Sequence, residues 1–152
     1  CSSDLNQLQG LGFEHYEVSN FSKPKFSAKH NLQYWRSQSV AAIGPSATGF
    51  LNLGETGVRY KWGTSVGSAK HSEEIITAEE LKVENFFLSM RINEGTNLNN
   101  YIAAPNMSEA IAFIEELKSG GYLIDATVEH LTLSPKGFLC ADSIISRLLS
   151  LF

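Results

Sequence analysis

Two neighbouring segments, His30-Asn31-Leu32-Gln33-Tyr34-Trp35 and Ala42-Ile43-Gly44-Pro45-Ser46-Ala47-Thr48-Gly49-Phe50, decide how the rest of the chain is interpreted. The first predicts a helical turn or a short helix, and Val40 to Ile43 predicts a short strand. Gly44 to Ala47 carries almost no side-chain bulk, so it predicts a tight turn where backbone can come close to a ligand. A histidine, two large aromatic side chains and this turn therefore fall within one short structural unit.

His30 has the most distinctive neighbours of the four histidines. A neutral imidazole at this position could ligate a haem iron, with Tyr34 or Trp35 packing on a face of the porphyrin. In the alternative interpretation His30 hydrogen-bonds a backbone carbonyl and holds the helix against a sheet. The residues alone leave both interpretations open.

Working outward, the pattern predicts β structure on both sides of this block. Phe13 to Val18 favours a strand because it is rich in aromatic and β-branched residues. Phe50 to Leu53 and Val58 to Trp62 predict two strands of a hairpin, joined by a loop at Gly54 to Gly57. The polar segment Gly63 to Ser72 contains glycine and serine, and it predicts a linker.

Beyond this linker the pattern becomes helical. Thr77 and Glu80 have the spacing of a capping box, and Asn106 with Glu109 predicts the cap of a second helix that Gly120-Gly121 stops. Short strands are expected at Tyr122 to Ile124 and His130 to Leu133. Ser134-Pro135 predicts the start of one last helix, whose apolar face carries Phe138, Ala141, Ile145 and Leu148.

Composition and charge limit the classes of function. The chain has 152 residues, two cysteines and a formal net charge of −4. Residues 78–152 contain five Lys and Arg against ten Asp and Glu, which argues against tight binding to nucleic acid. No apolar run is long enough for a membrane span. The chain starts at Cys1 without methionine or a leader sequence, so we expect it to be cut from a longer polypeptide.

A series of short motifs resembles a known family. Tyr16-Glu17-Val18-Ser19-Asn20-Phe21, Lys23-Pro24, His30 to Trp35 and Ile43 to Phe50, in this order, closely resemble the C-terminal part of the HemW-type radical SAM proteins, relatives of oxygen-independent coproporphyrinogen III oxidase. The likeness continues through further motifs to the end of the chain: Arg59-Tyr60, Phe87, Arg91, Gly95, Gly121 to Leu123, and Leu131 to Gly137.

The resemblance implies an α+β fold in two parts. Residues 1–72 would hold the last strand of a partial TIM-like barrel with a β-hairpin extension, and residues 73–152 a winged-helix-like domain. An isolated barrel strand would leave an open edge with unpaired backbone groups at Tyr16 to Phe21. The resemblance also implies a cytoplasmic parent that carries S-adenosylmethionine and a [4Fe–4S] cluster.

The family works in haem and porphyrin metabolism. Its coproporphyrinogen III oxidases convert propionates to vinyl groups, whereas the HemW type is a haem-binding chaperone that delivers haem to an accepting protein. The His30 to Trp35 block resembles the HemW branch, so haem or porphyrin is the expected ligand. The alternative is a non-catalytic module of a coproporphyrinogen III oxidase that docks a protein or the substrate.

The resemblance assigns ligand-binding residues within the two central segments. His30 would be the iron ligand, with Tyr34 and Trp35 as packing partners, and the turn would border the pocket for S-adenosylmethionine through Gly44, Ser46, Ala47 and Thr48. Ala42 and Pro45 depart from the usual family pattern, which makes a plain tight turn the competing interpretation. Polar residues at the end of the first strand, Tyr16, Glu17 and Asn20, are weaker candidates for the pocket mouth, and Arg59 for a carboxylate partner.

The sequence also limits the chemistry of the chain. A [4Fe–4S] cluster of this class is held by three thiolates in a C-x-x-x-C-x-x-C motif, which the sequence lacks. Cys1 and Cys140 cannot replace that motif. We therefore expect no radical catalysis by this chain alone.

Overall fold

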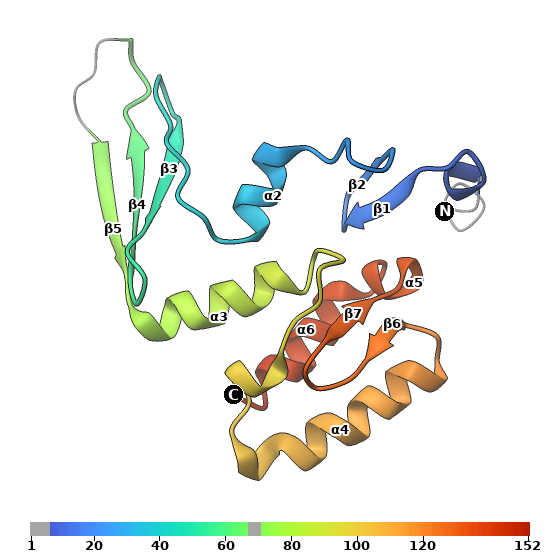
Figure 1. Cartoon of the computed structure of the whole chain (residues 1–152). Helices are drawn as coiled ribbons and strands as arrows, with labels where there is room; N and C mark the ends of the chain where they lie inside the picture. The colour runs from blue at the N-terminus through green and yellow to red at the C-terminus, as the bar shows by residue number, and fades with distance from the viewer. Residues whose placement is uncertain (1–6, 67–70) are drawn as a thin grey trace. The chain divides into compact units, whose positions relative to one another are not determined.

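The computed structural model describes residues 7–66 and 71–152. Its backbone contacts divide the chain into two compact units (Figure 1). Unit 1 comprises Cys1–Lys29 with Phe86–Phe152, and unit 2 comprises His30–Asn85. No helix in the described ranges is both long and apolar enough to cross a bilayer.

Unit 2 is built on a three-stranded antiparallel sheet. Strands β3 (Thr48–Asn52), β4 (Gly57–Trp62) and β5 (His71–Ile76) pair in that order and stand side by side in Figure 1. The predicted hairpin is confirmed, with Phe50 opposite Arg59. The predicted linker is wrong at His71 and Ser72, which pair with β4, while residues 67–70 of that prediction lie outside the described residues.

The short helix α2 (Lys29–Trp35) confirms the prediction for the His30 block. The strand predicted at Val40 to Ile43 is wrong beyond its first residue. Val40 makes an isolated bridge to Phe50, with both backbone hydrogen bonds at 2.7 and 2.9 Å. The ladder stops there because the backbone groups of Ala42 bind side chains of β4 instead.

Helix α3 (Ala78–Ser89) starts in unit 2 and ends in unit 1. Its predicted capping box is confirmed: the Thr77 N–H donates to Glu80 Oε2 at 2.9 Å, and the Glu80 N–H donates to Thr77 Oγ1 at 3.3 Å. The box satisfies amide groups that have no partner within the helix.

Unit 1 contains most of the buried apolar side chains. Its elements are the β1 (Glu14–Glu17) and β2 (Asn20–Ser22) hairpin, the 3₁₀ turn η1 (Leu98–Asn100), α4 (Ala104–Ser119), the hairpin of β6 (Leu123–Ala126) with β7 (Leu131–Leu133), α5 (Pro135–Phe138) and α6 (Ala141–Leu149). Residues 7–10 are also helical. The core contains Phe86, Leu98, Ile145 and Leu148, all without exposed surface.

Three details of unit 1 correct the predictions. Helix α4 begins before Asn106 because Pro105 occupies its first turn, and the Asn106 side chain donates to the Leu151 carbonyl at 2.9 Å instead of capping. The last helix is two helices, because the backbone of Cys140 leaves the helical conformation between them.

The third correction concerns the first strand, which is not an open edge. β1 pairs with β2 on one side. On the other, the Val18 N–H donates to the Arg91 carbonyl at 2.9 Å and the Asn93 N–H donates to the Tyr16 carbonyl at 3.1 Å. Residues 91–93 thus satisfy the Val18 N–H and the Tyr16 carbonyl of the expected open edge within unit 1.

Candidate functional site

Helix α2 presents two of the predicted ligand-binding side chains to solvent. His30 is exposed and Tyr34 keeps 45% of its surface. The rings lie edge to face, with centroids 5.1 Å apart and planes at 67°, as the one-turn spacing in a helix allows. Trp35 is half-buried, and among the described residues its ring does not contact His30. The structure therefore brings together His30 and Tyr34, but not Trp35.

The end of α2 is fixed by the sheet of unit 2. Ser37 adopts a left-handed conformation with φ 52°, and the Gln38 N–H closes the helix by donating to the Gln33 carbonyl at 2.9 Å. Asn52 of β3 then donates through Nδ2 to the Ser37 carbonyl at 2.7 Å. These contacts link the helix that carries His30 to a strand end without using the imidazole.

The predicted tight turn between Ala42 and Thr48 is present. Gly44 has φ 112°, a conformation that favours glycine, and a Cβ built on it would meet no atom within 4 Å. Ser46 also has a positive φ of 61°. The Ser46 N–H donates to the Gly63 carbonyl at 3.0 Å, and the Ala47 N–H donates to the Gly44 carbonyl at 3.1 Å. The amides of Ser46 and Ala47 are thus engaged within the protein, whereas the space above Gly44 is open.

Two aromatic side chains of β4, Tyr60 and Trp62, hold this turn, and neither was assigned to the site from the sequence. The Ala42 N–H donates to Tyr60 Oη at 2.9 Å, and Trp62 Nε1 donates to the Ala42 carbonyl at 2.6 Å. A Cβ on Gly49 would collide with the Tyr60 ring, so glycine at this position lets the ring reach the turn. The sequence did contain a signal for this pair: Tyr60 and Trp62 are two residues apart on one strand, so their side chains lie on the same face of the sheet.

His71 on β5 extends this aromatic group. Its ring centroid lies 5.6 Å from that of Trp62 and 6.3 Å from that of Tyr60. His71 Nε2 is 2.8 Å from Glu73 Oε1, and the His71 side chain keeps 39% of its surface. Unit 2 therefore offers two exposed imidazoles near aromatic rings, His30 and His71.

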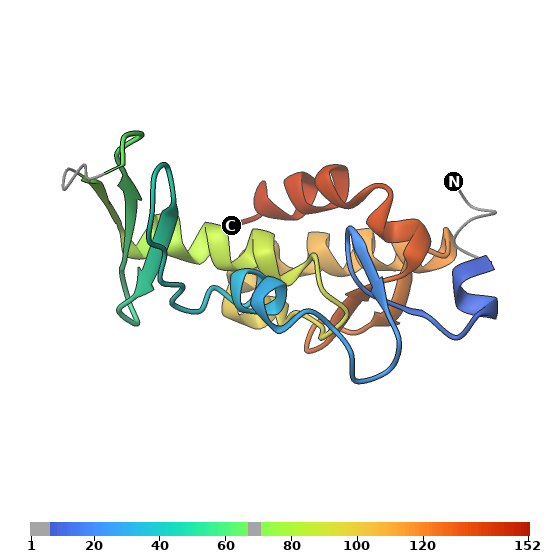
Figure 2. The same cartoon turned by 90° about the horizontal axis from the view of Figure 1, so that it is seen from above.

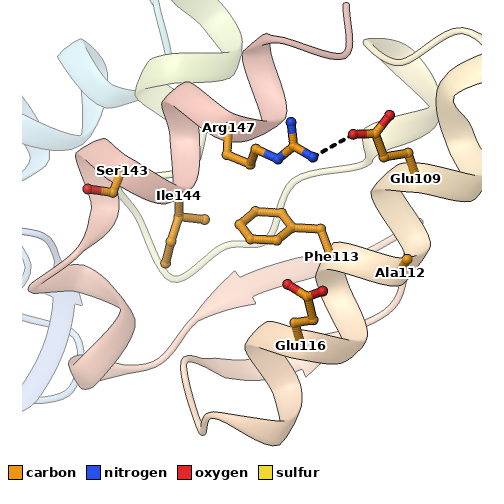
Figure 3. A pocket seen from close by; sticks show the side chains of 7 residues that line it. All are labelled: Glu109, Ala112, Phe113, Glu116, Ser143, Ile144 and Arg147. Carbon is orange, nitrogen blue, oxygen red and sulfur yellow. Dashed lines mark hydrogen bonds and ion pairs between the residues drawn. The ribbon is translucent and has the colours of Figure 1, made fainter.

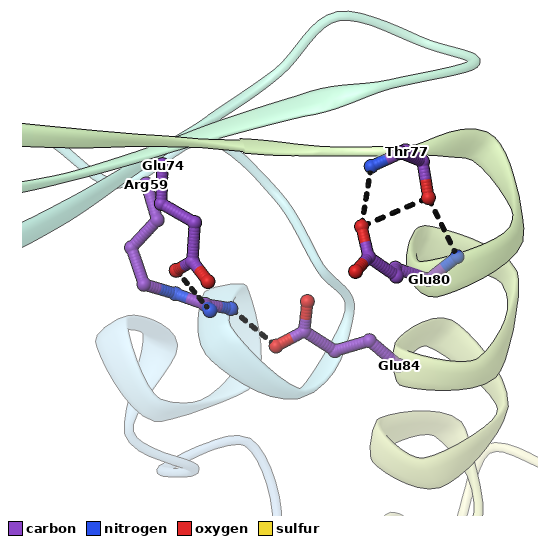
Figure 4. A network of polar contacts seen from close by, with 5 residues as sticks. All are labelled: Arg59, Glu74, Thr77, Glu80 and Glu84. Atoms are coloured by element: carbon purple, nitrogen blue, oxygen red, sulfur yellow. Dashed lines mark hydrogen bonds and ion pairs between the residues drawn. The ribbon is translucent and has the colours of Figure 1, made fainter.

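Arg59 lies on the other face of the same sheet and has protein partners (Figure 4). Its guanidinium pairs with Glu74 of β5 at 3.2 Å and with Glu84 of α3. Figure 4 also draws the capping box at the start of α3, where the hydrogen bonds that Thr77 and Glu80 exchange lower the pKa of the Glu80 carboxyl. Because both partners of Arg59 are carboxylates, a ligand carboxylate would have to displace one of them.

Of the three weaker candidates on the first hairpin, Asn20 is exposed, whereas Tyr16 and Glu17 are buried. Tyr16 keeps 5% of its surface and Glu17 none. Glu17 accepts a hydrogen bond from the Ser19 N–H at 2.9 Å and another from Asn20 Nδ2. These hydrogen bonds satisfy the carboxylate inside unit 1. The interpretation of Tyr16 and Glu17 as an open pocket mouth is therefore wrong for this structure.

The residues present do not fit an iron–sulfur cluster. No group of three or more His, Cys, Asp or Glu side chains that could hold a metal occurs among residues 7–66 and 71–152. Cys140 is a free, exposed cysteine. A haem site needs fewer protein ligands than an iron–sulfur cluster, because one imidazole can serve as an axial ligand when aromatic rings pack on the porphyrin. His30 with Tyr34 fits that requirement in its chemistry.

No protein-family model matches the chain. Its sequence is 33% identical over 158 residues to a protein named heme chaperone HemW from Lactococcus lactis, covering 95% of this chain and 40% of the relative. It is 30% identical over 162 residues to the mitochondrial radical S-adenosyl methionine domain-containing protein 1 of Danio rerio, covering 93% of this chain and 36% of the relative.

The fold resembles that of a solved structure, coproporphyrinogen III oxidase from Escherichia coli, described as a radical SAM enzyme. The TM-score is 0.64 at 13% sequence identity, and the match covers 99% of this chain and 40% of the enzyme. At this identity the likeness concerns the fold. The chain spans about two fifths of the length of the relatives it matches. The sequence and fold comparisons together identify the chain as a C-terminal part of the HemW-type radical SAM proteins.

Proposed function

We propose that this chain is the haem-handling part of a HemW-like protein that binds haem and delivers it to an accepting protein. The observation that carries the proposal is the 33% identity to a heme chaperone over 95% of the chain. The sheets and helices of the two units would correspond to the end of a partial TIM-like barrel with its extension, residues 1–72, and to a winged-helix-like domain, residues 73–152. The longer protein would be cytoplasmic.

The proposed iron ligand is His30. The exposure of its side chain on α2 supports this role, because a haem arriving from solvent needs an accessible imidazole. Tyr34 stands edge to face against the same ring and would pack on the porphyrin. Trp35 would join it after a rearrangement of its half-buried ring.

The turn after α2 is the proposed contact for S-adenosylmethionine in the longer protein. Gly44, Ser46, Ala47 and Thr48 would border the ligand, and the open space above Gly44 supports this assignment. Since the amides of Ser46 and Ala47 already donate within the protein, their contacts would use a hydroxyl or a carbonyl. The cluster would be held by cysteines outside this sequence.

A docking module of a coproporphyrinogen III oxidase is the second candidate. The likeness to the Escherichia coli enzyme concerns the fold alone and does not favour this candidate over the chaperone. The two functions differ in what this chain does with iron: a docking module binds porphyrin or protein without an iron ligand, whereas a chaperone supplies one. Iron ligation therefore separates the two.

The test is a haem titration of this chain followed by Soret absorbance. We expect a saturable shift that His30→Ala weakens at least tenfold, because loss of the axial ligand leaves only ring packing. His130→Ala is the matched control, since it removes another exposed histidine, in unit 1. His71→Ala tests the second exposed imidazole of unit 2.

Each result has a definite meaning. A shift lost only in His30→Ala supports the chaperone with His30 as ligand. A shift lost only in His71→Ala would move the ligand to β5 and overturn the assignment of His30. An unshifted Soret band in the unmodified chain, with binding of iron-free protoporphyrin retained, would favour the docking module.

A further inference from the structure

Unit 1 has a groove lined by residues of helices α4 and α6, both of which can be followed in Figures 1 and 2. Its volume is about 390 Å³, and its lining comes from both helices: Glu109, Ala112, Phe113, Glu116, Ser143, Ile144 and Arg147. Figure 3 shows the Phe113 ring projecting from α4 toward α6. The groove exists because α4 packs mainly against β6 rather than along α6.

The floor of the groove is apolar. Ile144 keeps 4% of its surface, and half-buried Phe113 packs against the main hydrophobic cluster of unit 1. Ala112 adds a small side chain that leaves room above the floor. A long aliphatic or aromatic group would find contact on this floor, because such surface gains free energy when it leaves water.

The rim carries an excess of negative charge. At one end Arg147 and Glu109 form an ion pair at 2.5 Å across the two helices. At the other end lies Glu116, and no described residue forms a hydrogen bond or ion pair with its carboxylate. With Arg147 compensated by Glu109, the groove presents one net negative charge to an incoming group. A cation is the complementary partner, whereas a phosphate would be repelled.

The spacing of these features defines the partner further. Phe113 and Glu116 are three residues apart on α4, which is about 4.5 Å along the helix axis. An occupant must therefore place a cation roughly one helical turn from an apolar group. Apart from Phe113 and Ile144, the lining residues are exposed, so the groove is too shallow to enclose a small molecule as most ligand sites do. A side-chain pair on the surface of another protein suits it better.

From the charge and the spacing we infer that the α4–α6 groove docks an amphipathic segment of a partner protein that carries a lysine or arginine one helical turn from a large apolar residue. The apolar residue lies on Phe113 and Ile144, and the cation pairs with Glu116. This mode is helix-in-groove recognition. The inference does not rest on haem binding, because every residue it uses lies in unit 1 and His30 lies in unit 2.

The test uses the full chain with isotope-labelled amides and isoleucine methyl groups. The probes are two synthetic amphipathic helices of equal length: one carries lysine one turn from leucine along its face, and the other carries glutamate in place of each lysine. We expect the lysine peptide to shift the signals of Phe113, Ile144 and Arg147 in a saturable way. The glutamate peptide should leave them unchanged.

Two adjacent carboxylates on α4 supply the matched variants. Glu116→Gln should raise the dissociation constant of the lysine peptide about threefold to tenfold, as expected for the loss of one partly exposed ion pair. Glu115→Gln is the control, because Glu115 pairs with Lys118 at 3.6 Å and does not line the groove. Unchanged amide signals away from the groove would verify that both variants fold.

Three outcomes would overturn the inference. The first is a lysine peptide that leaves the groove signals unshifted. The second is an equal loss of affinity in Glu115→Gln and Glu116→Gln, since that would show general attraction to an acidic surface. The third is saturation of the groove by hexylammonium as tightly as by the lysine peptide, because the groove would then be a site for small amines. Retained haem binding alongside any of these would leave the proposed function standing.

Discussion

At the scale of single residues, His15 is a titratable group whose pKa is changed by its surroundings. Its ring stacks on Phe21 at a centroid distance of 4.1 Å and meets Phe138 edge-on at 4.8 Å. Desolvation lowers its pKa below the ordinary value, although the Val18 carbonyl and the charge of Glu17 act in the opposite direction. His15 Nδ1 is buried and has no hydrogen-bond partner among the described residues.

This lowered pKa makes the stability of unit 1 depend on pH. The unfolded chain binds a proton at His15 near its ordinary pKa of about 6.5, whereas the folded chain binds it only at lower pH. The contribution of the neutral His15 is therefore fully present above about pH 6.5 and is lost as the pH falls toward the folded pKa. Urea unfolding followed by circular dichroism between about pH 5 and pH 8 should show this slope.

The control is His15→Phe, which keeps an aromatic ring between Phe21 and Phe138 but cannot titrate. We expect this variant to flatten the slope, and His130→Gln, at an exposed histidine, to leave it unchanged. The Glu80 carboxyl, whose pKa is lowered by Thr77, titrates at more acidic pH and does not interfere. Equal slopes in the unmodified chain and His15→Phe would contradict the assignment.

At the scale of elements, Ser134 joins three segments of unit 1. Its Oγ accepts a hydrogen bond from the Gly137 N–H at 3.1 Å and donates one to the Gly121 carbonyl at 2.8 Å, while its own N–H donates to the Tyr122 carbonyl at 2.8 Å. The hydroxyl thus caps α5 and ties it to the end of α4. Ser134 is buried, so a lost partner would not be replaced freely by water.

We expect Ser134→Ala to lower the free energy of unfolding of unit 1 by about 1–2 kcal/mol, the usual cost of losing a helix N-cap. Ser119→Ala is the matched control, because Ser119 is exposed and its hydroxyl only donates to the Glu115 carbonyl within α4. Chemical denaturation of both variants measures the difference. A Ser134→Ala variant as stable as Ser119→Ala would show that the cap contributes little.

The elements that could be predicted from sequence are those with local signals. The caps at Thr77 and Ser134 were predicted because capping uses residues within one turn. β5 was missed because His71 to Ile75 are all exposed, so the strand lacks the alternation of a half-buried surface and depends on its pairing with β4. The end of the strand after Val40 was missed because it depends on Tyr60 and Trp62, whose positions only the folded sheet supplies.

At the scale of the whole molecule, the sequence was enough to identify the family but only part of the site. The motif order identified the family because the motifs extend along most of the chain, and relatives matching up to 95% of it confirm this. The pairing of His30 with Tyr34 follows from helical spacing alone. The α4–α6 groove could not be predicted, because it depends on the distance between two helices that the β6–β7 hairpin separates in sequence.

The two units also differ in the amount of apolar surface they bury. Among the described residues, the buried apolar side chains of unit 2 are Val40, Ile76 and Leu81, and those of unit 1 include the whole main cluster around Phe86 and Ile145. Burial of one large apolar side chain is worth about 1.5–3 kcal/mol. Unit 2 therefore has less stabilisation to hold its sheet closed, and local opening is expected there first.

Amide hydrogen exchange under native conditions measures this difference directly. We expect the free energy of opening at Tyr60, in the central strand β4, to be about 2–4 kcal/mol lower than at Ile145 in α6, which corresponds to roughly 30-fold to 1,000-fold faster exchange. Phe86→Ala should lower the free energy of opening at the Ile145 amide by about 3–5 kcal/mol, because it creates a cavity in the main cluster. The free energy of opening at the Tyr60 amide should change much less. Equal opening energies at the two amides, falling together in Phe86→Ala, would mean that the chain unfolds as one cooperative body. In that case the proposed haem-binding residues of unit 2 would depend on the core of unit 1, and a loss of haem binding in a unit 1 variant would no longer indicate a role in the proposed site.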